Sequence, residues 1–197
     1  MKITVVRGDI TRQDVEAVVT AANTKLRGGG GVDGAVHAAA GPRLLQASLA
    51  LAPCPPGGAV LTGAFDLAPV RWVIHAVGPI YQGPQDAATL TSAYTQALAR
   101  ADEVGATSVA FPSISTGAYG YPLAEAAAVS MSALCGAVTA VQSVLLVAFS
   151  PRVQELWERA LDGGPASNSG RRSRRDRTDG PAVGSCTRSW MAARHPR

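Results

Sequence analysis

The sequence predicts an α/β protein in which helices pack on a central β-sheet. Short runs rich in β-branched residues alternate along the chain with longer segments rich in Ala and Leu, as is typical of layered α/β structures. Two of the short runs, residues 73–74 and 144–147, are continuously apolar, as expected for strands covered by helices on both faces. Hydrophobic residues make up 47% of the chain but aromatic residues only 5%, so the core must be built mainly from Ala, Val and Leu.

The predicted elements follow this alternation from the N-terminus onward. The runs rich in β-branched residues predict strands over residues 3–6, 17–20, 59–64, 72–77, 108–111 and 144–149. The Ala- and Leu-rich segments predict helices over residues 34–40, 43–51, 87–104, 123–138 and 153–161. In the helix over residues 87–104, one apolar face recurs at steps of three and four residues, and we expect it to cover the sheet. That face consists of Leu90, Tyr94, Ala97, Leu98 and Ala101.

We expect residues 1–162 to form one domain and residues 163–197 to form a disordered basic tail. A length of 197 residues corresponds to one ordinary domain with some excess. Residues 1–162 contain 10 Lys and Arg against 12 Asp and Glu, whereas residues 163–197 contain 8 against 2, so the net charge of +4 arises in the tail. The tail has too few apolar residues to offset its chain entropy, and its Arg-rich residues 171–177 are of a type that contacts nucleic-acid phosphates. A solvated appendage and a shift of reading frame after residue 162 are the alternatives.

The composition argues against membrane and secreted classes of protein. No apolar run approaches the roughly 20 residues that span a bilayer, and the N-terminus turns polar too early for a secretory signal. Cys54, Cys135 and Cys186 are widely spaced and odd in number, so they encode neither a disulfide framework nor a zinc site. We therefore expect a cytoplasmic protein, and the excess of Arg over Lys in an Ala-rich chain favours a bacterium with GC-rich DNA.

Two glycine-rich turns, each between a predicted strand and a predicted helix, are the strongest candidates for a ligand site. Residues 28–34 read Gly-Gly-Gly-Gly-Val-Asp-Gly, and residues 113–120 read Ser-Ile-Ser-Thr-Gly-Ala-Tyr-Gly. Glycines let backbone N–H groups converge on an anion, and the N-terminus of a following helix adds partial positive charge. Because ligands of α/β sheets bind outside the carboxyl ends of strands, both turns can reach one crevice, where we expect a diphosphate.

Two common nucleotide-binding motifs do not fit these turns. Gly29, Gly31 and Gly34 have the spacing of the dinucleotide fingerprint, but residues 21–28 separate them from the preceding strand. Residues 49–59 also lack the acidic residue that would bind a ribose. No Gly-Lys-Ser/Thr follows either turn, so the P-loop motif is absent as well.

The residues around the two turns resemble the macro domain family, and within it the MacroD-type hydrolases. The combination of both glycine-rich turns is the most specific part of the match. In order, the matching segments are residues 8–11, 21–23, 28–37, 39–41, 73–79 and 112–122, which together span most of residues 1–161. The resemblance implies a three-layer α/β/α fold with a mixed central sheet that binds ADP-ribose.

The resemblance also implies which residues contact ADP-ribose. Asp9 would accept a hydrogen bond from the adenine amino group beside the backbone of Ile10, and Phe149 would pack on the adenine ring. The alternative for Phe149 is an ordinary core aromatic. The two turns would hold the diphosphate and the distal ribose through Gly31, Val32, Ser115, Thr116, Gly117, Ala118 and Tyr119.

For catalysis, the resemblance points to Asn23 and Asp33. The Asn23 amide would hold the distal ribose hydroxyls, and Asp33 would orient or deprotonate a water for attack near C1″ or on an ester carbonyl. A substrate phosphate is the alternative base. The family has Asn at the position of Thr20, and this departure bears on rate and substrate preference more than on binding.

Several other polar side chains are interpreted as structural. We expect His37 to be packed or to support the loop, His75 to belong to an apolar strand, and Glu16 to be solvated in a turn. Cys54 and Cys135 lack a paired His and so do not fit thiol catalysis. No cluster of His, Cys, Asp and Glu has the spacing of metal ligands, so we expect neither a metal ion nor another cofactor.

The leading functional hypothesis is a hydrolase that removes mono-ADP-ribose from Glu and Asp side chains of proteins and deacetylates O-acetyl-ADP-ribose. Asn23 together with Asp33 favours this hypothesis. A non-catalytic reader of free or protein-linked ADP-ribose is the first alternative, and Thr20 favours it. A hydrolase acting on ADP-ribosylated nucleic acid is the second, and it depends on residues 171–177. No membrane partner is expected.

Overall fold

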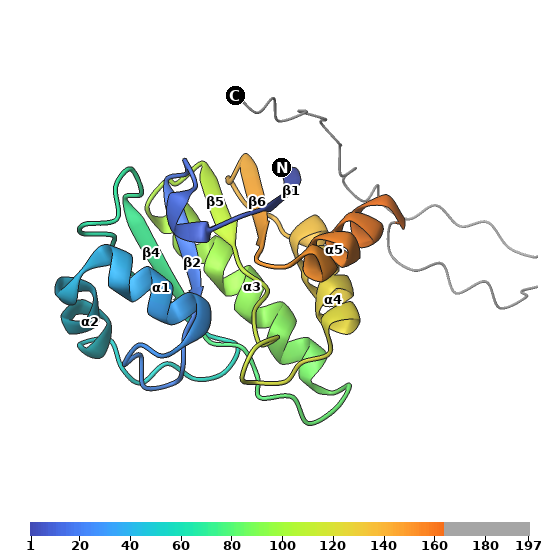
Figure 1. The fold of residues 1–197 in the computed structure, drawn as a ribbon, viewed down its shortest axis with the longest axis horizontal. Helices are drawn as coiled ribbons and strands as arrows, with labels where there is room; N and C mark the ends of the chain where they lie inside the picture. Colours follow the sequence, from blue (N-terminus) through green and yellow to red (C-terminus); the bar gives the residue numbers. More distant parts are fainter. Residues whose placement is uncertain (164–197) are drawn as a thin grey trace, which may run out of the picture.

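A computed structural model describes residues 1–163, which form one mixed six-stranded sheet with helices on both faces (Figure 1). The strand order is β1-β6-β5-β2-β4-β3. Neighbouring strands are parallel from β1 through β4, and β3 pairs antiparallel with β4 at one edge. The strands are β1 (Lys2–Arg7), β2 (Ala17–Ala21), β3 (Ala59–Gly63), β4 (Trp72–Ala76), β5 (Ser108–Phe111) and β6 (Ser143–Ala148).

The helices divide into two layers, which confirms the three-layer α/β/α architecture. On one face, α3, α4 and α5 pack on one another and on the sheet over a core that contains Tyr94, Phe111 and Trp157. On the other face, α1 and α2 cover a smaller core that contains Val18, Val36 and Val73. The helices are α1 (Gly31–Ala40), α2 (Pro42–Leu49), α3 (Asp86–Glu103), α4 (Leu123–Gly136) and α5 (Pro151–Gly163), with a short 3-10 helix η1 (Ile10–Arg12) after β1.

Every predicted strand and helix is present, and the differences lie at the ends of elements. The most consequential difference is that α1 begins at Gly31 rather than at residue 34, with Gly30 in an extended conformation before it. Asp33 therefore lies in the first turn of α1 and not in a loop. Later in the chain, α4 stops at Gly136 rather than at residue 138, and Ala137 after it adopts an extended conformation.

Glu16 is partly solvated, as expected, with a side chain that is 36% exposed, but it also makes contacts that the sequence did not predict. Its carboxylate accepts hydrogen bonds from the backbone N–H and the hydroxyl of Thr107, at 2.6 and 2.9 Å, and its backbone N–H donates to the Ser108 hydroxyl. The Thr107 hydrogen bonds hold the pKa of the Glu16 carboxyl below its usual value. Glu16 thereby ties the start of β2 to the start of β5 (Figure 1).

No helix within residues 1–163 is both long enough and apolar enough to cross a bilayer. The predicted basic tail, including the Arg-rich residues 171–177, falls almost entirely on residues 164–197 and lies outside the described residues.

Candidate functional site

The predicted site residues follow strands whose carboxyl ends all lie at one edge of the sheet, the lower edge in Figure 1. Asp9 follows β1, Asn23 follows β2 and Phe149 follows β6. The two glycine-rich turns follow β2 and β5, which are paired neighbours in the sheet. Three strand spacings separate β1 from β2, about 14 Å at the usual distance between strands, so this edge suits an elongated ligand.

The first turn is shaped by glycines that contact side chains or backbone directly. Gly28 and Gly31 have positive φ angles of 73° and 59°, which favour glycine. A Cβ atom on Gly34 would lie 2.5 Å from the carbonyl oxygen of Gly29, so a side chain there would push the turn outward. The first N–H groups of α1, including those of Gly31 and Val32, have no partner within the helix, as in other anion-binding helix N-termini.

Asn23 braces this turn. Its side-chain nitrogen donates a hydrogen bond of 2.7 Å to the carbonyl of Gly28, and its side-chain oxygen accepts one of 3.1 Å from the N–H of Lys25. The amide nitrogen carries two hydrogens, so one remains for a ligand. Asn23 is thus a structural part of the turn as well as a candidate for contact with ribose.

Asp33 is the most buried of the predicted site residues that carry a charge, at 3% exposed. Its Oδ1 accepts a hydrogen bond of 2.9 Å from the Thr20 hydroxyl and lies 3.7 Å from Nε2 of His37. Its Oδ2 faces the turn, because a Cβ atom on Gly29 would lie 3.5 Å from that oxygen and 3.9 Å from the Asn23 side-chain nitrogen. Burial raises the pKa of the Asp33 carboxyl above its usual value, while the Thr20 hydrogen bond opposes that rise. A carboxyl group whose pKa is raised by burial, and which lies beside a polar turn, has the properties of a general base.

A buried polar cluster lies between α1 and the sheet, and the sequence reasoning found only part of it. His75 on β4 is fully buried, and its Nε2 is 2.9 Å from the hydroxyl of Thr62 on β3. Its Nδ1 has no hydrogen-bond partner among the described residues, and its ring centroid lies 5.9 Å from that of His37. Burial, aided by the charge of His37, lowers the pKa of His75 to about 4, so the ring is neutral near pH 7. The structural role expected of His75 fits these contacts.

Asp33, His37 and His75 each have one atom that could bind a metal ion, and these three atoms lie within 4.8 Å of one another. The sequence-based expectation that no such cluster exists was wrong, because residues from α1 and β4 meet only in the fold. Two ligands at about 2.1 Å from one zinc ion lie at most about 4.2 Å apart, so a separation as wide as 4.8 Å would have to shorten to hold zinc. In this structure, Asp33 Oδ1 accepts a hydrogen bond from Thr20 and His75 Nε2 is engaged with Thr62, so two of the candidate ligand atoms already have partners outside the cluster.

The second glycine-rich turn packs directly against Gly78, which follows β4. A Cβ atom on Gly78 would lie 2.1 Å from the Ser115 hydroxyl oxygen and 2.5 Å from Ile114. Ser115 is buried, has a positive φ of 66°, and its hydroxyl has no partner among the described residues. Thr116 caps back onto the carbonyl of Ser113 at 2.9 Å, and the carbonyl of Tyr119 accepts a hydrogen bond from the N–H of Tyr81. Gly117 and Ala118 are exposed at the crest of the turn.

The remaining predicted contacts lie together at the β1 and β6 end of the edge, since the N–H of Gly8 donates to the carbonyl of Ala148. Asp9 Oδ1 accepts hydrogen bonds from the Thr11 hydroxyl and N–H, which lower the pKa of the Asp9 carboxyl. Its Oδ2 is 3.8 Å from the Arg12 guanidinium and has room to accept a further bond, whereas Ile10 is buried. Phe149 is 93% exposed, so the alternative of an ordinary core aromatic was wrong.

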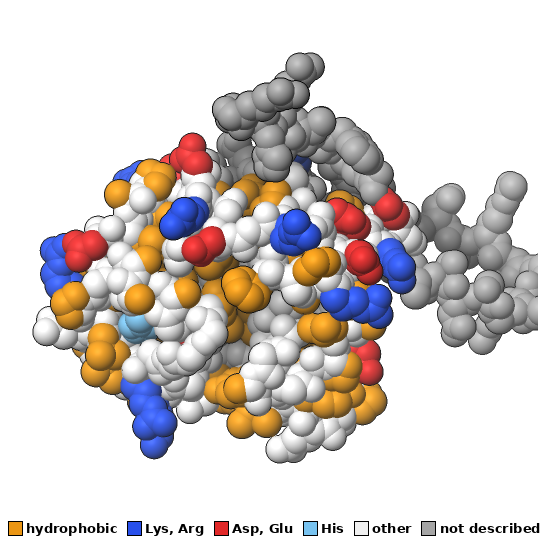
Figure 2. All heavy atoms as spheres, viewed as in Figure 1, with side chains coloured by type: hydrophobic (Ala, Val, Ile, Leu, Met, Phe, Trp, Pro, Cys, Tyr) orange, Lys and Arg blue, Asp and Glu red, His pale blue; other side chains and the backbone are white. Residues whose placement is uncertain are grey.

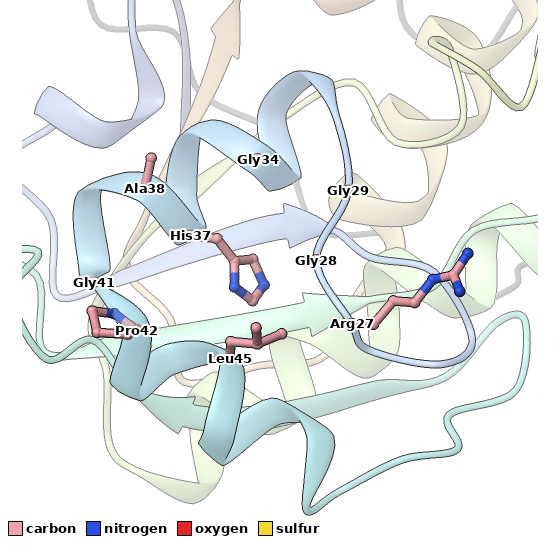
Figure 3. Close-up of a pocket in the computed structure, with 9 residues that line it drawn as sticks. All are labelled: Arg27, Gly28, Gly29, Gly34, His37, Ala38, Gly41, Pro42 and Leu45. Atoms are coloured by element: carbon pink, nitrogen blue, oxygen red, sulfur yellow. The ribbon is translucent and has the colours of Figure 1, made fainter.

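Few charged side chains line the lower edge on the face in Figure 2, where the visible side chains are mostly hydrophobic or uncharged. An anion there would depend on backbone N–H groups. An open cavity of about 440 Å³ lies beside the first glycine-rich turn, between α1, α2 and Arg27 (Figure 3). His37 and Leu45 point into it, but Asn23, Asp33 and residues 113–120 do not line it. It is therefore not the crevice predicted between the two turns.

The chain matches the family model of the macro domain over residues 19–130. It is 44% identical over 166 residues to a macro domain-containing protein of Streptomyces coelicolor, covering 81% of this chain and 98% of that protein. It is also 44% identical over 169 residues to a Citrobacter rodentium protein named O-acetyl-ADP-ribose deacetylase, covering 81% and 95%. Among solved structures, a mutant of the Oceanobacillus iheyensis macrodomain with ADP-ribose aligns with a TM-score of 0.77 at 39% identity, covering 81% of this chain and 91% of that one.

The matched residues include both glycine-rich turns, the end of β2 and all of β5, in agreement with the resemblance to the macro domain seen in the sequence. The chain belongs to the macro domain family.

Proposed function

We propose that this protein binds ADP-ribose and hydrolyses esters at its distal ribose, with O-acetyl-ADP-ribose and mono-ADP-ribosylated Glu or Asp side chains as substrates. One observation carries the proposal. Asp33 is buried with one oxygen anchored and the other facing the turn that Asn23 braces, which is the arrangement expected of a carboxylate base beside a ribose site.

ADP-ribose would extend along the edge of the sheet. Adenine would lie at the β1 and β6 end, where the free oxygen of Asp9, the backbone of Ile10 and the exposed ring of Phe149 are available. The diphosphate would accept hydrogen bonds from the N–H groups of Gly31 and Val32 and from the second turn. That second turn comprises Ser115, Thr116, Gly117, Ala118 and Tyr119. The distal ribose would then lie beside Asn23 and Asp33.

The reaction follows from that placement. The Asp33 carboxylate takes a proton from a water molecule as the water oxygen bonds to the ester carbonyl carbon. The bond between that carbon and the ribose oxygen then breaks, and the ribose oxygen takes up the proton. The products are ADP-ribose and a carboxylic acid, which is acetic acid or the side chain of Glu or Asp. Attack at C1″ gives the same products when the ester is at C1″, and in both cases the proton passes through Asp33.

The names of the relatives support ADP-ribose binding and the deacetylation of O-acetyl-ADP-ribose. The Citrobacter rodentium relative is named for the deacetylation of O-acetyl-ADP-ribose, and the Oceanobacillus iheyensis structure contains ADP-ribose. The hydrogen bond from Thr20 to Asp33 weakens the argument for a non-catalytic reader, because the departure at Thr20 leaves the carboxylate held.

The proposal is tested with a protein mono-ADP-ribosylated on glutamate and with Asp33→Asn, which keeps the shape of the side chain but removes its basicity. We expect the wild-type chain to release ADP-ribose and Asp33→Asn to be slower by about 10²- to 10⁴-fold, the range for a general base. Asp66→Asn is the matched control, because Asp66 pairs with Arg43 on the surface. Tight binding of ADP-ribose without release by the wild-type chain would identify a reader instead.

A further inference from the structure

Thr20 and Asp33, which precede and end the first glycine-rich loop region, form a buried hydrogen-bonded pair. Thr20 lies on β2 beside His75 of β4 and is fully buried, and Asp33 lies on the first turn of α1. The Thr20 hydroxyl is 2.9 Å from Asp33 Oδ1. Within residues 1–163, it is the only hydrogen-bond donor to this carboxylate. A hydrogen bond between two buried groups is costly to break, because the acceptor cannot turn to water instead.

The two oxygens of Asp33 have different surroundings. Oδ1 accepts a hydrogen bond from the Thr20 hydroxyl and lies 3.7 Å from His37 Nε2, whereas Oδ2 lies on the side of Gly29, where the Asn23 amide also borders the turn. Holding Oδ1 fixes the plane of the carboxyl group and directs Oδ2 toward the place where the ribose would lie. The terminal torsion of Asp is broad, so without a donor at Oδ1 the group would rotate.

The other groups that face Asp33 do not replace this bond. His37 on α1 is too distant for a hydrogen bond, and His75 on β4 is engaged with Thr62 on β3. Thr20 is also suited to the task mechanically. It is β-branched and lies on a strand, so its side chain has few rotamers and its hydroxyl position is well defined.

We propose that Thr20 is a positioning residue for the hydrolysis, which anchors Asp33 Oδ1 so that Oδ2 reaches the attacking water. This inference rests on the proposed function and assigns a role to the position at which the sequence departs from its family. In this chain, Thr20 takes the place of the usual Asn and supports catalysis.

The test compares Thr20→Val, which is nearly isosteric but has no hydroxyl, with Thr20→Ser, which restores it. We expect Thr20→Val to lower kcat by about 10- to 100-fold, as for the loss of a hydrogen bond to a charged group, and Thr20→Ser to recover most of the rate. The Kd for ADP-ribose should change by less than about twofold, because the bond acts on the reacting geometry. Thr107→Val is the matched control, since it removes the Thr hydroxyl that bonds to Glu16 away from the site.

A second measurement does not depend on activity. Carbon-13 NMR titration of the Asp33 carboxyl should give a higher pKa in Thr20→Val than in the wild-type chain, because the lost hydrogen bond favours the charged form. The acid limb of the kcat profile should move to higher pH by the same amount. Thermal unfolding establishes that each variant is folded.

An unchanged kcat and an unchanged Asp33 titration in folded Thr20→Val would overturn the inference. Equal losses of rate and ADP-ribose affinity that Thr20→Ser does not restore would also overturn it, since they would show a general structural role. If the wild-type chain does not hydrolyse either ester, the proposed function fails, whereas the NMR titration still decides whether Thr20 holds Asp33.

Discussion

Gly34→Ala tests how closely the first turn is packed on α1. In an ordinary helix interior, this substitution stabilises a protein by up to about 1 kcal/mol, because Ala has the higher helix propensity. Here the new Cβ would lie 2.5 Å from the carbonyl oxygen of Gly29, and real Cβ contacts are essentially never below 3.0 Å. The backbone of the turn would therefore have to move by about 0.5 Å or more, which is the kind of overpacking that costs about 1–3 kcal/mol.

Even with the full gain from helix propensity subtracted, the net loss is up to about 2 kcal/mol, and Tm should fall by up to about 8 °C for a domain of this size. Calorimetry on the variant measures the shift, and Gly136→Ala is the matched control. Gly136 is also the glycine of a helix, but a Cβ there would meet no atom within 4 Å, so its Tm should stay the same or rise. A displaced turn should also weaken ADP-ribose binding, which a titration checks. If Gly34→Ala raised Tm as much as Gly136→Ala, the packing argument would be refuted.

Four further predictions follow from other contacts. Gly78→Ala would bring a Cβ within 2.1 Å of the Ser115 hydroxyl oxygen, so calorimetric titration should show weaker ADP-ribose binding in a chain that remains folded. Ser130→Ala removes the acceptor for the buried indole N–H of Trp157, at 2.9 Å, and urea unfolding should show a loss of about 1–3 kcal/mol. The pKa of His75 is about 4 in the fold, against about 6.5 in an unfolded chain, so only the unfolded chain takes up this proton as the pH drops from 6.5 to 4. The free energy of unfolding should therefore decrease by up to about 3 kcal/mol as the pH is lowered through this range. In His75→Gln, this part of the pH dependence should be absent. Because the proposed hydrolysis activates water through Asp33 alone, a chelator should leave the rate of ADP-ribose release unchanged. A rate that falls on chelation and recovers with added Zn²⁺ would show instead that the Asp33, His37 and His75 cluster holds a metal ion.

The sequence predicted the elements of this fold well because their signals are local. Strands such as Ser108–Phe111 are short, mainly apolar runs, here between Thr107 and Pro112, and α3 carries a regular apolar face. The ends of helices were harder. The start of α1 was placed at residue 34 instead of Gly31 because Gly31 has low helix propensity, and here packing against the turn and the sheet outweighs that preference.

The site divides in the same way. Motifs placed Asn23, Asp33 and the two turns at one edge, because the carboxyl ends of parallel strands must meet there. The contacts among Thr20, Asp33, His37 and His75 were not predictable, since they join β2, α1 and β4 across 13 or more residues of sequence or through a helical turn. The hydrogen bonds of Glu16 were missed for the same reason, because its partner Thr107 is 91 residues away.

The most direct test of the central claim is the release of acetate from O-acetyl-ADP-ribose by the wild-type chain and by Asp33→Asn, with ADP-ribose affinity measured for both. We expect acetate release by the wild-type chain, a loss of at least about 100-fold in Asp33→Asn, and similar affinity for ADP-ribose in the two proteins. Acetate release at the same rate from both proteins would contradict the central claim.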